Sequence, residues 1–236
     1  MNDQQLYRWL PGLLRLQSWL SPAFPIGSYS YSHGLEWAVE AGQIDDRSSL
    51  VDWLDADLRY GSGWNEAIFF HEAWRCTFEN DLARLFEIAE LAAACRGTSE
   101  LALESSQQGT ACLAMLYHVW PDRMLNWLAQ ILRKHHVPPV ASVVLGIGLS
   151  RQGIPARPAL SAFLQSYVAN LVTAGVRLIP LGQTDGQLAV AELEAAVLAT
   201  AAQAMKSTLG NVGSTAIMVD LASMAHETQY TRLFRS

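Results

Sequence analysis

Apolar residues recur along most of the chain at intervals of three and four positions, which places them on one face of a helix. The run Leu50, Trp53, Leu54 and Leu58 shows this spacing clearly, with Asp46 ahead of it as the expected N-cap. The same pattern predicts further helices over residues 65–78, 82–95, 101–120, 122–136, 158–177 and 187–206. Convincing pairs of strands with period-two alternation are absent from the sequence. The pattern therefore predicts an all-α fold, an irregular bundle of about ten helices.

Two apolar segments need a separate interpretation. Residues 140–149 contain several valines that also suit a strand. Since no neighbouring strand is available for pairing, we interpret this segment as a buried helix. Residues 158–176 carry no charge and are long enough to span a bilayer. Polar side chains are scattered through them, so we expect a helix buried in a soluble bundle instead.

The amino-acid composition limits which classes of protein this chain can belong to. Half of the 236 residues are apolar, and no flexible linker or repeat divides them, so we predict a single domain over residues 1–236. The formal net charge of −6 disfavours binding to a nucleic-acid backbone. Arg8 and Arg15 interrupt the apolar start of the chain, so we expect no signal peptide. A soluble cytoplasmic protein is the resulting prediction.

Three cysteines occur in apolar, helix-like stretches, at Cys76, Cys95 and Cys112. Their number is odd, their spacing is wide, and they form no CxxC pair. We interpret them as buried free thiols in a reducing compartment.

The usual signatures of an enzyme are incomplete in this sequence. The glycines of LGIGLSRQGIP, residues 145–155, match a phosphate-binding loop in spacing, but Ile154 and Pro155 replace its Lys and Ser/Thr. Close helix packing or a helix end explains these glycines better. His33 follows several serines, yet the GxSxG pattern of hydrolases is missing. The pair His135–His136 lacks accompanying metal ligands. We therefore predict no catalytic residue, no metal site and no cofactor.

Three polar segments have a composition that the packing of a helical bundle does not require. They are residues 24–36, residues 181–187 and a C-terminal tail, residues 224–236. They combine glycine, hydroxyl groups, tyrosine and arginine, residue types that are frequent in protein interfaces. The candidate interface residues are Gly27, Ser28, Tyr29, Ser30, Gln183, Asp185, Gln187, His226, Glu227, Tyr230, Arg232, Leu233 and Phe234.

Each segment also has a structural explanation. The first suits the N-cap and first turn of a helix entering at Ser32. The second suits a helix connection in which Thr184 or Asp185 caps the next helix. The C-terminal tail either binds a partner or docks on its own domain.

Three motifs in these segments carry a resemblance. FPIGSYSYSHGLE (residues 24–36), PLGQTDGQ (residues 180–187) and HETQYTRLFRS (residues 226–236) are similar, in this order, to the signature segments of the urease accessory protein UreF family. The resemblance spans nearly the whole chain. It implies an all-α homodimer, without enzymatic activity or a cofactor of its own, that acts in nickel delivery to urease. The implied partners are UreD (also called UreH), the GTPase UreG and the urease apoprotein.

The resemblance also implies that Tyr29 and Arg232 matter, and we expect a hydrogen bond near Tyr29 from Arg232. Two other functions stay open. In the first, the protein activates the UreG GTPase by donating Arg151 or Arg157. In the second, it is a small-molecule enzyme with an unrecognised site.

Overall fold

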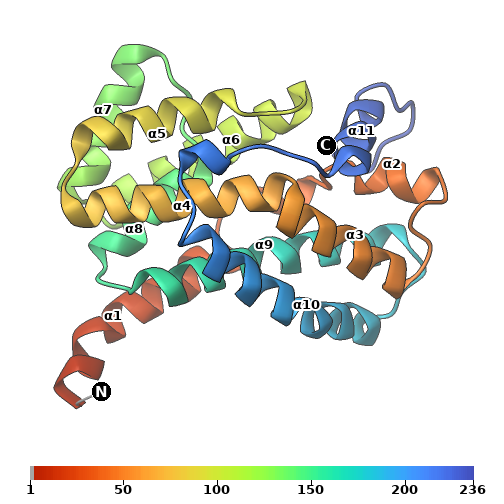
Figure 1. The fold of residues 1–236 in the computed structure, drawn as a ribbon, viewed down its shortest axis with the longest axis horizontal. Helices are drawn as coiled ribbons and strands as arrows, with labels where there is room; N and C mark the ends of the chain where they lie inside the picture. The colour runs from red at the N-terminus through yellow and green to blue at the C-terminus, as the bar shows by residue number, and fades with distance from the viewer. Residues whose placement is uncertain (1–2) are drawn as a thin grey trace.

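The computed structural model describes residues 3–236, with side chains from Leu10 onwards. Arg8, used above to exclude a signal peptide, therefore has its side chain outside the described part. The described chain contains eleven α-helices and two short 3-10 helices and no β-strand, which confirms the all-α bundle (Figure 1). The elements are α1 (Asp3–Trp19), η1 (Ser28–Ser30), α2 (Leu35–Glu40), α3 (Arg47–Tyr60), α4 (Ser62–Glu79), α5 (Leu82–Ala94), α6 (Ser99–Val119), α7 (Arg123–His135), α8 (Ala141–Arg151), α9 (Ala156–Leu178), α10 (Gln183–Ala204), η2 (Leu209–Asn211) and α11 (Ile217–His226).

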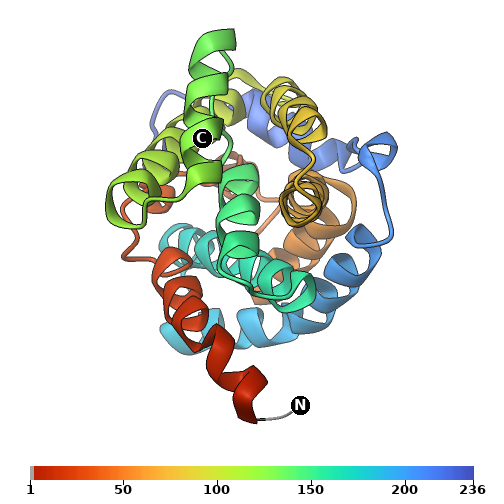
Figure 2. The same cartoon turned by 90° about the vertical axis from the view of Figure 1, so that its left-hand side faces the viewer.

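The helices α4, α8 and α9 form the centre of the bundle. Helix α10 packs on α9 and α3, while α5, α6 and α7 contact the other side of α8 (Figures 1 and 2). The contact between α4 and α8 is close because Gly146 has no side chain: a Cβ atom there would lie 2.5 Å from the carbonyl oxygen of Phe70. Gly153, just after α8, has a positive φ of 71°. The interpretation of these glycines as packing and helix-end residues is confirmed.

Helix starts follow the expected capping chemistry at two places. Asp46 caps α3 and accepts a 2.8 Å hydrogen bond from the Ser49 amide. Asp122 caps α7 in the same manner, with a 2.7 Å bond from the Met124 amide. The predicted cap Asp46 is confirmed, and Asp122 lies at the start of the helix predicted over residues 122–136.

Two predicted helix starts are wrong. Helix α2 begins at Leu35, not at Ser32, because Gly34 precedes it with φ 79°. Helix α10 begins at Gln183 with Gly182 as N-cap, so neither Thr184 nor Asp185 caps it. The physical reason at α10 is that the Asp185 carboxylate pairs with Arg47 of α3, 3.2 Å away, instead of with amides of its own helix.

The two ambiguous apolar segments are both helices. Residues 140–149 correspond to α8, whose residues from Ser142 to Ser150 are buried, so the prediction of a buried helix is confirmed. Helix α9 is the one described helix that is long and apolar enough to cross a membrane, and half of the tested window is buried inside the bundle. Its contacts with α10 and α4 are those of a core helix.

The three cysteines are free thiols. Cys76 and Cys112 are buried, whereas Cys95 is only partly buried, which corrects the prediction for that residue. Burial raises the pKa of Cys76 to about 11 and that of Cys112 to about 12. Both thiols therefore stay protonated and unreactive at neutral pH.

Candidate functional site

The first polar segment and the C-terminal tail come from opposite ends of the chain and meet beside α2 and α11 (Figure 1). The first three residues of the tail, from Met224 to His226, form the last turn of α11. The remaining residues run without regular structure across the start of α2 and α6. The two segments thus form one surface region, although more than 190 residues separate them in sequence.

Glu36 is the central group of this region. Its side chain is almost fully buried, with 8% of the residue exposed. One carboxylate oxygen accepts a 2.6 Å hydrogen bond from the Leu233 amide, and the other accepts a 2.8 Å bond from the Phe234 amide. Hydrogen bonds to a charged group are the stronger class, each contributing about 1.5–3 kcal/mol. The Glu36 carboxylate therefore holds two successive backbone amides of the tail.

Backbone bonds continue this contact to the last residue of the sequence. The Arg235 amide donates to the carbonyl of Ser30 at 2.8 Å, and the Ser32 amide donates to the carbonyl of Ser236 at 2.6 Å. The hydroxyl of Ser236 donates to Glu104 of α6 at 2.7 Å. The tail is thus docked on the rest of the chain through residues 232–236, and its binding to a partner stays a prediction.

The expected bond between Arg232 and Tyr29 is wrong. Arg232 instead donates to Glu100 at the start of α6, 2.6 Å away. The carbonyl of Tyr29 accepts from Arg177 of α9 at 2.9 Å, and the same guanidinium lies 4.4 Å from the ring centre of Phe234. The physical reason is electrostatic, because Arg232 reaches a charged carboxylate, whereas the carbonyl and hydroxyl of Tyr29 are neutral acceptors. Arg177 therefore links the first segment to the tail.

His226 and Glu227 tie the end of α11 to its neighbours. The His226 ring is completely buried, and its two nitrogens lie 2.7 Å from Glu100 and 3.3 Å from Glu36. Glu227 accepts two 2.8 Å hydrogen bonds from the amide and hydroxyl of Ser99. These bonds lower the pKa of the Glu227 carboxyl.

Three residues of the second polar segment, Gln183, Gly186 and Gln187, line a cavity that is open to the surface. Ser28 and Tyr29 of the first segment line the same cavity, which has a volume of about 500 Å³. Asp185 lies apart, in its ion pair with Arg47. The structure therefore joins the second segment to the first across the cavity, and it joins the first to the tail by direct hydrogen bonds.

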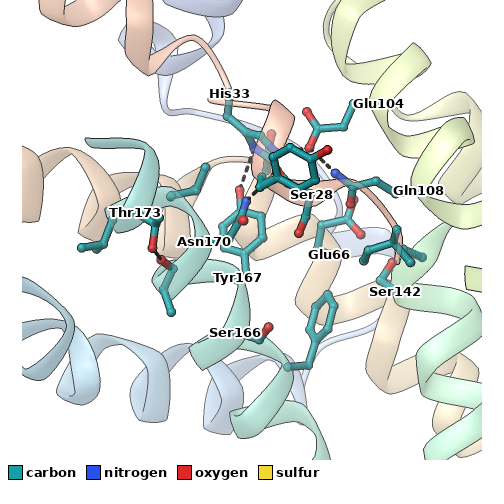
Figure 3. A pocket seen from close by; sticks show the side chains of 18 of the residues that line it. Ser28, His33, Glu66, Glu104, Gln108, Ser142, Ser166, Tyr167, Asn170 and Thr173 are labelled. Atoms are coloured by element: carbon teal, nitrogen blue, oxygen red, sulfur yellow. Dashed lines mark hydrogen bonds and ion pairs between the residues drawn. The ribbon is translucent and has the colours of Figure 1, made fainter. Parts of the chain in front are cut away.

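His33 is the main titratable group of this cavity (Figure 3). Its Nε2 lies 2.8 Å from Glu104, and its Nδ1 lies 3.1 Å from the hydroxyl of Tyr167, which donates to Asp57 at 2.7 Å. Burial alone lowers the pKa of His33, but Glu104 and, more weakly, Asp57 and Glu66 outweigh it and raise the pKa to about 8. Burial also raises the pKa of Asp57 and, together with the Asp57 charge, that of Tyr167. The two ring nitrogens thus pair with Glu104 and Tyr167 and not with a serine, so a serine–histidine pair is not formed.

Among the side chains that the structure describes, from Leu10 onwards, no three of His, Cys, Asp or Glu come together as a group able to hold a metal ion. Sequence reasoning missed Glu36, Glu100, Glu104 and Arg177 as site residues. Glu36 ends the first motif, so position in that motif is a signal that could have identified it. The pairing of Glu100 and Glu104 with the tail has no sequence signal, since it depends on how α6 and the tail pack.

An exposed apolar surface lies beside the docked tail. It consists of large side chains from one side of α11 and from the tail, and we call it the α11 face: Ile217, Met218, Leu221, Met224, Tyr230 and Leu233. All of them are between 48% and 102% exposed. Large exposed apolar side chains gathered on one helix and the segment that follows it are typical of protein-interaction sites. The arrangement is therefore suited to contact another protein.

Comparison with known proteins gives one consistent result. The family model described as UreF matches residues 44–194 of the chain. A urease accessory protein UreF from Bradyrhizobium diazoefficiens is 48% identical over 95% of this chain and 91% of its own length. Proteins of the same name from Rhodopseudomonas palustris (strain HaA2) and Granulibacter bethesdensis are 45% and 46% identical, over 95% of this chain and 93% and 94% of their lengths. With nearly complete coverage at this identity, the chain belongs to the UreF family of urease accessory proteins.

Proposed function

We propose that this protein is a non-enzymatic scaffold in urease maturation. In this proposal it is a cytoplasmic homodimer that binds UreD (UreH), and the two proteins recruit the GTPase UreG. The complex engages the urease apoprotein and couples GTP hydrolysis to nickel insertion. The relatives are named urease accessory proteins, which supports a role in urease maturation. The individual partners rest on the resemblance of the three sequence motifs.

The observation that carries the scaffold proposal is the α11 face with the docked tail next to it. Exposed apolar side chains supply binding free energy when a partner covers them, about 1.5–3 kcal/mol for one fully buried Leu or Met. Tyr230 and Leu233 stand out from a tail whose backbone Glu36 holds in place. An already ordered surface loses little conformational entropy on binding. We assign UreD to this surface.

The test is light-scattering chromatography of the protein mixed with purified UreD. Leu221→Arg places a charge in the centre of the α11 face, and we expect binding to weaken by at least roughly 10- to 150-fold. Leu198→Arg is the matched control, because Leu198 is similarly exposed (59%, against 48% for Leu221) but lies on α10. The mass of the free protein in the same experiment tests the homodimer.

Two results would contradict the assignment. UreD binding that survives both Leu221→Arg and truncation after Met224 would place the partner elsewhere. Equal loss of binding in Leu221→Arg and Leu198→Arg would show that the effect is not specific to the α11 face.

The two arginines of the UreG-activator hypothesis differ in their surroundings. Arg151 is engaged with the cap residue Asp122, with its Nε 3.0 Å from one carboxylate oxygen, and Arg157 is exposed in the first turn of α9. A donated arginine must reach the phosphates of a partner. Single-turnover GTP hydrolysis by UreG, with and without Arg151→Ala and Arg157→Ala, tests this function. An acceleration lost in either variant would establish it.

The small-molecule enzyme has one specific observation in its favour, the cavity with His33 and its raised pKa. However, His33, Tyr167 and Asp57 are hydrogen-bonded to one another, an arrangement that a structural network explains. The scaffold proposal expects His33→Gln to leave UreD binding intact in a folded protein. A ligand that binds the wild type and not His33→Gln would favour the enzyme.

A further inference from the structure

The cavity that contains the His33 network also has a large apolar wall. Side chains of α1, α8 and α9 form this wall, among them Trp19, Leu145 and Phe163. The cavity volume of about 500 Å³ falls in the range of roughly 300–1,000 Å³ that is usual for pockets that bind small molecules. Since the cavity is open to the surface, a small molecule can enter it while the helices stay packed.

Helix α8 begins at this cavity, and its first two residues, Ala141 and Ser142, line it. The N-cap residue is Val140, whose side chain cannot accept a hydrogen bond, and no described side chain caps the helix. The amide of Val144 bonds to the carbonyl of Val140 at 3.0 Å, as the first regular bond of the helix. The amides of the preceding residues therefore lack a capping acceptor, and the helix dipole adds partial positive charge at the same place.

The Ser142 hydroxyl has no hydrogen-bond partner among the described residues, although Ser142 is 0% exposed and lines the cavity (Figure 3). A serine inside a helix often donates to the carbonyl four residues earlier. For Ser142 that residue is Pro138, which precedes the helix. The indole N–H of Trp19 is a second buried donor without a described partner at the same cavity. Unpartnered buried donors are rare, so those that line a cavity point to an acceptor inside it.

The charges of the cavity balance at neutral pH. Its described lining contains three carboxylates and three cationic side chains, namely Glu66, Glu104, Asp220, His33, Arg96 and Arg177. Glu66 forms an ion pair with Arg96, and Glu104 forms one with His33. Burial lowers the pKa of His33, but Glu104 outweighs this effect and raises the pKa to about 8, so the ring is charged at pH 7. An anion at the start of α8 therefore meets carboxylates that cations already neutralise.

We propose that the N-terminus of α8 and the Ser142 hydroxyl form a binding site for a small carboxylate with a hydrocarbon body. The carboxylate accepts hydrogen bonds from the hydroxyl and from the free amides of α8, a type of site that is common at helix N-termini. Leu145 lies one turn further along the same helix, so the hydrocarbon body packs against Leu145 and Phe163 beside the bound carboxylate. Inorganic phosphate suits the helix N-terminus as well, but it has no apolar part to cover this wall.

The experiment is nuclear magnetic resonance of the full chain at pH 7, with labelled backbone amides, titrated separately with butanoate, hexanoate and octanoate. We expect saturable shifts of the Ala141 and Ser142 amides. Burial of the hydrocarbon should raise the affinity by roughly fourfold for each added CH₂ group. Octanol lacks the carboxylate and inorganic phosphate lacks the hydrocarbon, so both should bind more weakly than octanoate at these amides.

Three results of this titration would overturn the proposal. Octanoate that shifts only residues of the α11 face, or no residue at all, would exclude the site. Octanol that binds as tightly as octanoate would show that the carboxylate is not recognised, and tighter binding of phosphate would exclude the assigned class of ligand. The wild type alone gives these results, and UreD is absent, so failure of the site is distinguishable from failure of the scaffold function.

Two serine variants on the same helix test the hydroxyl. Ser142→Ala removes one hydrogen bond to a charged ligand, so octanoate should bind roughly 10- to 150-fold more weakly. The free variant should unfold at no lower urea concentration than the wild type, because the hydroxyl has no described partner to lose. Ser150→Ala is the matched control, since Ser150 is also a buried, unpartnered serine of α8 but does not line the cavity. Its affinity should stay within twofold of the wild type. Unchanged binding in Ser142→Ala, or an equal loss in both variants, would overturn the proposal.

Discussion

Replacing Glu36 with glutamine removes one of the two oxygens that hold the backbone of the C-terminal tail. The wild-type carboxylate accepts from the Leu233 amide at 2.6 Å and from the Phe234 amide at 2.8 Å. The glutamine amide keeps one acceptor oxygen, and its NH₂ group faces a donor where an acceptor is needed. The loss of one hydrogen bond to a charged group costs about 1.5–3 kcal/mol. The undocked tail should then be roughly 10- to 150-fold more populated.

The assay is limited trypsin digestion at constant pH, with mass spectrometry of the fragments released after Arg232 and Arg235. Cleavage tracks the population of the open form when opening is faster than cleavage. The rate of release should therefore rise by the same factor in Glu36→Gln. The midpoint of global unfolding should change less, because glutamine is also a good helix former.

The matched control is Glu40→Gln, on the same helix but exposed and bonded only to the side chain of Gln229. We expect less than a fivefold change there, since an exposed polar contact contributes at most about 1 kcal/mol. Release from Glu36→Gln within twofold of the wild type would refute the reasoning. An equal rise in both variants would show that the charge of α2, and not the two backbone bonds, holds the tail.

Three further predictions concern stability and reactivity. Gly34→Ala should lower the free energy of unfolding by well over 1 kcal/mol, because the position has φ +79° and a Cβ atom would lie 2.6 Å from the backbone of α11. Gly42→Ala, with φ +70° and open space around it, should cost only the conformational part, about 1–2 kcal/mol, in the same urea titration. The raised pKa of His33, about 8 against 6.5, should contribute about 2 kcal/mol of stability below pH 6.5 that is lost as the pH rises through 8. Unfolding curves of wild type and His33→Gln should therefore converge at high pH, and a constant difference would contradict the assignment. Cys76 and Cys112, with pKa values of about 11 and 12, should react with a thiol reagent at pH 7.5 only at the rate of unfolding, whereas faster labelling would show that the core opens locally.

Local chemistry explains why much of this fold could be predicted from the sequence. The spacing of Leu50, Leu54 and Leu58 specifies one face of α3, and the Asp46 carboxylate satisfies a free amide at its start. Both effects act within one or two turns of helix, so they are visible in any window of sequence. The same holds for α7 and its cap Asp122. The three sequence motifs likewise pointed to the segments that meet at the candidate site.

Tertiary structure decided which groups in those segments touch. The partners of Glu36 lie 190 to 198 residues away, and Arg232 binds Glu100 instead of the region of Tyr29. Such pairings depend on the angle at which α2, α6 and α11 pack, and no local signal encodes that angle. For the same reason, the sequence showed His226 as an isolated histidine. Only the folded chain places a carboxylate at each of its ring nitrogens, because burial brings together groups that water would otherwise keep apart.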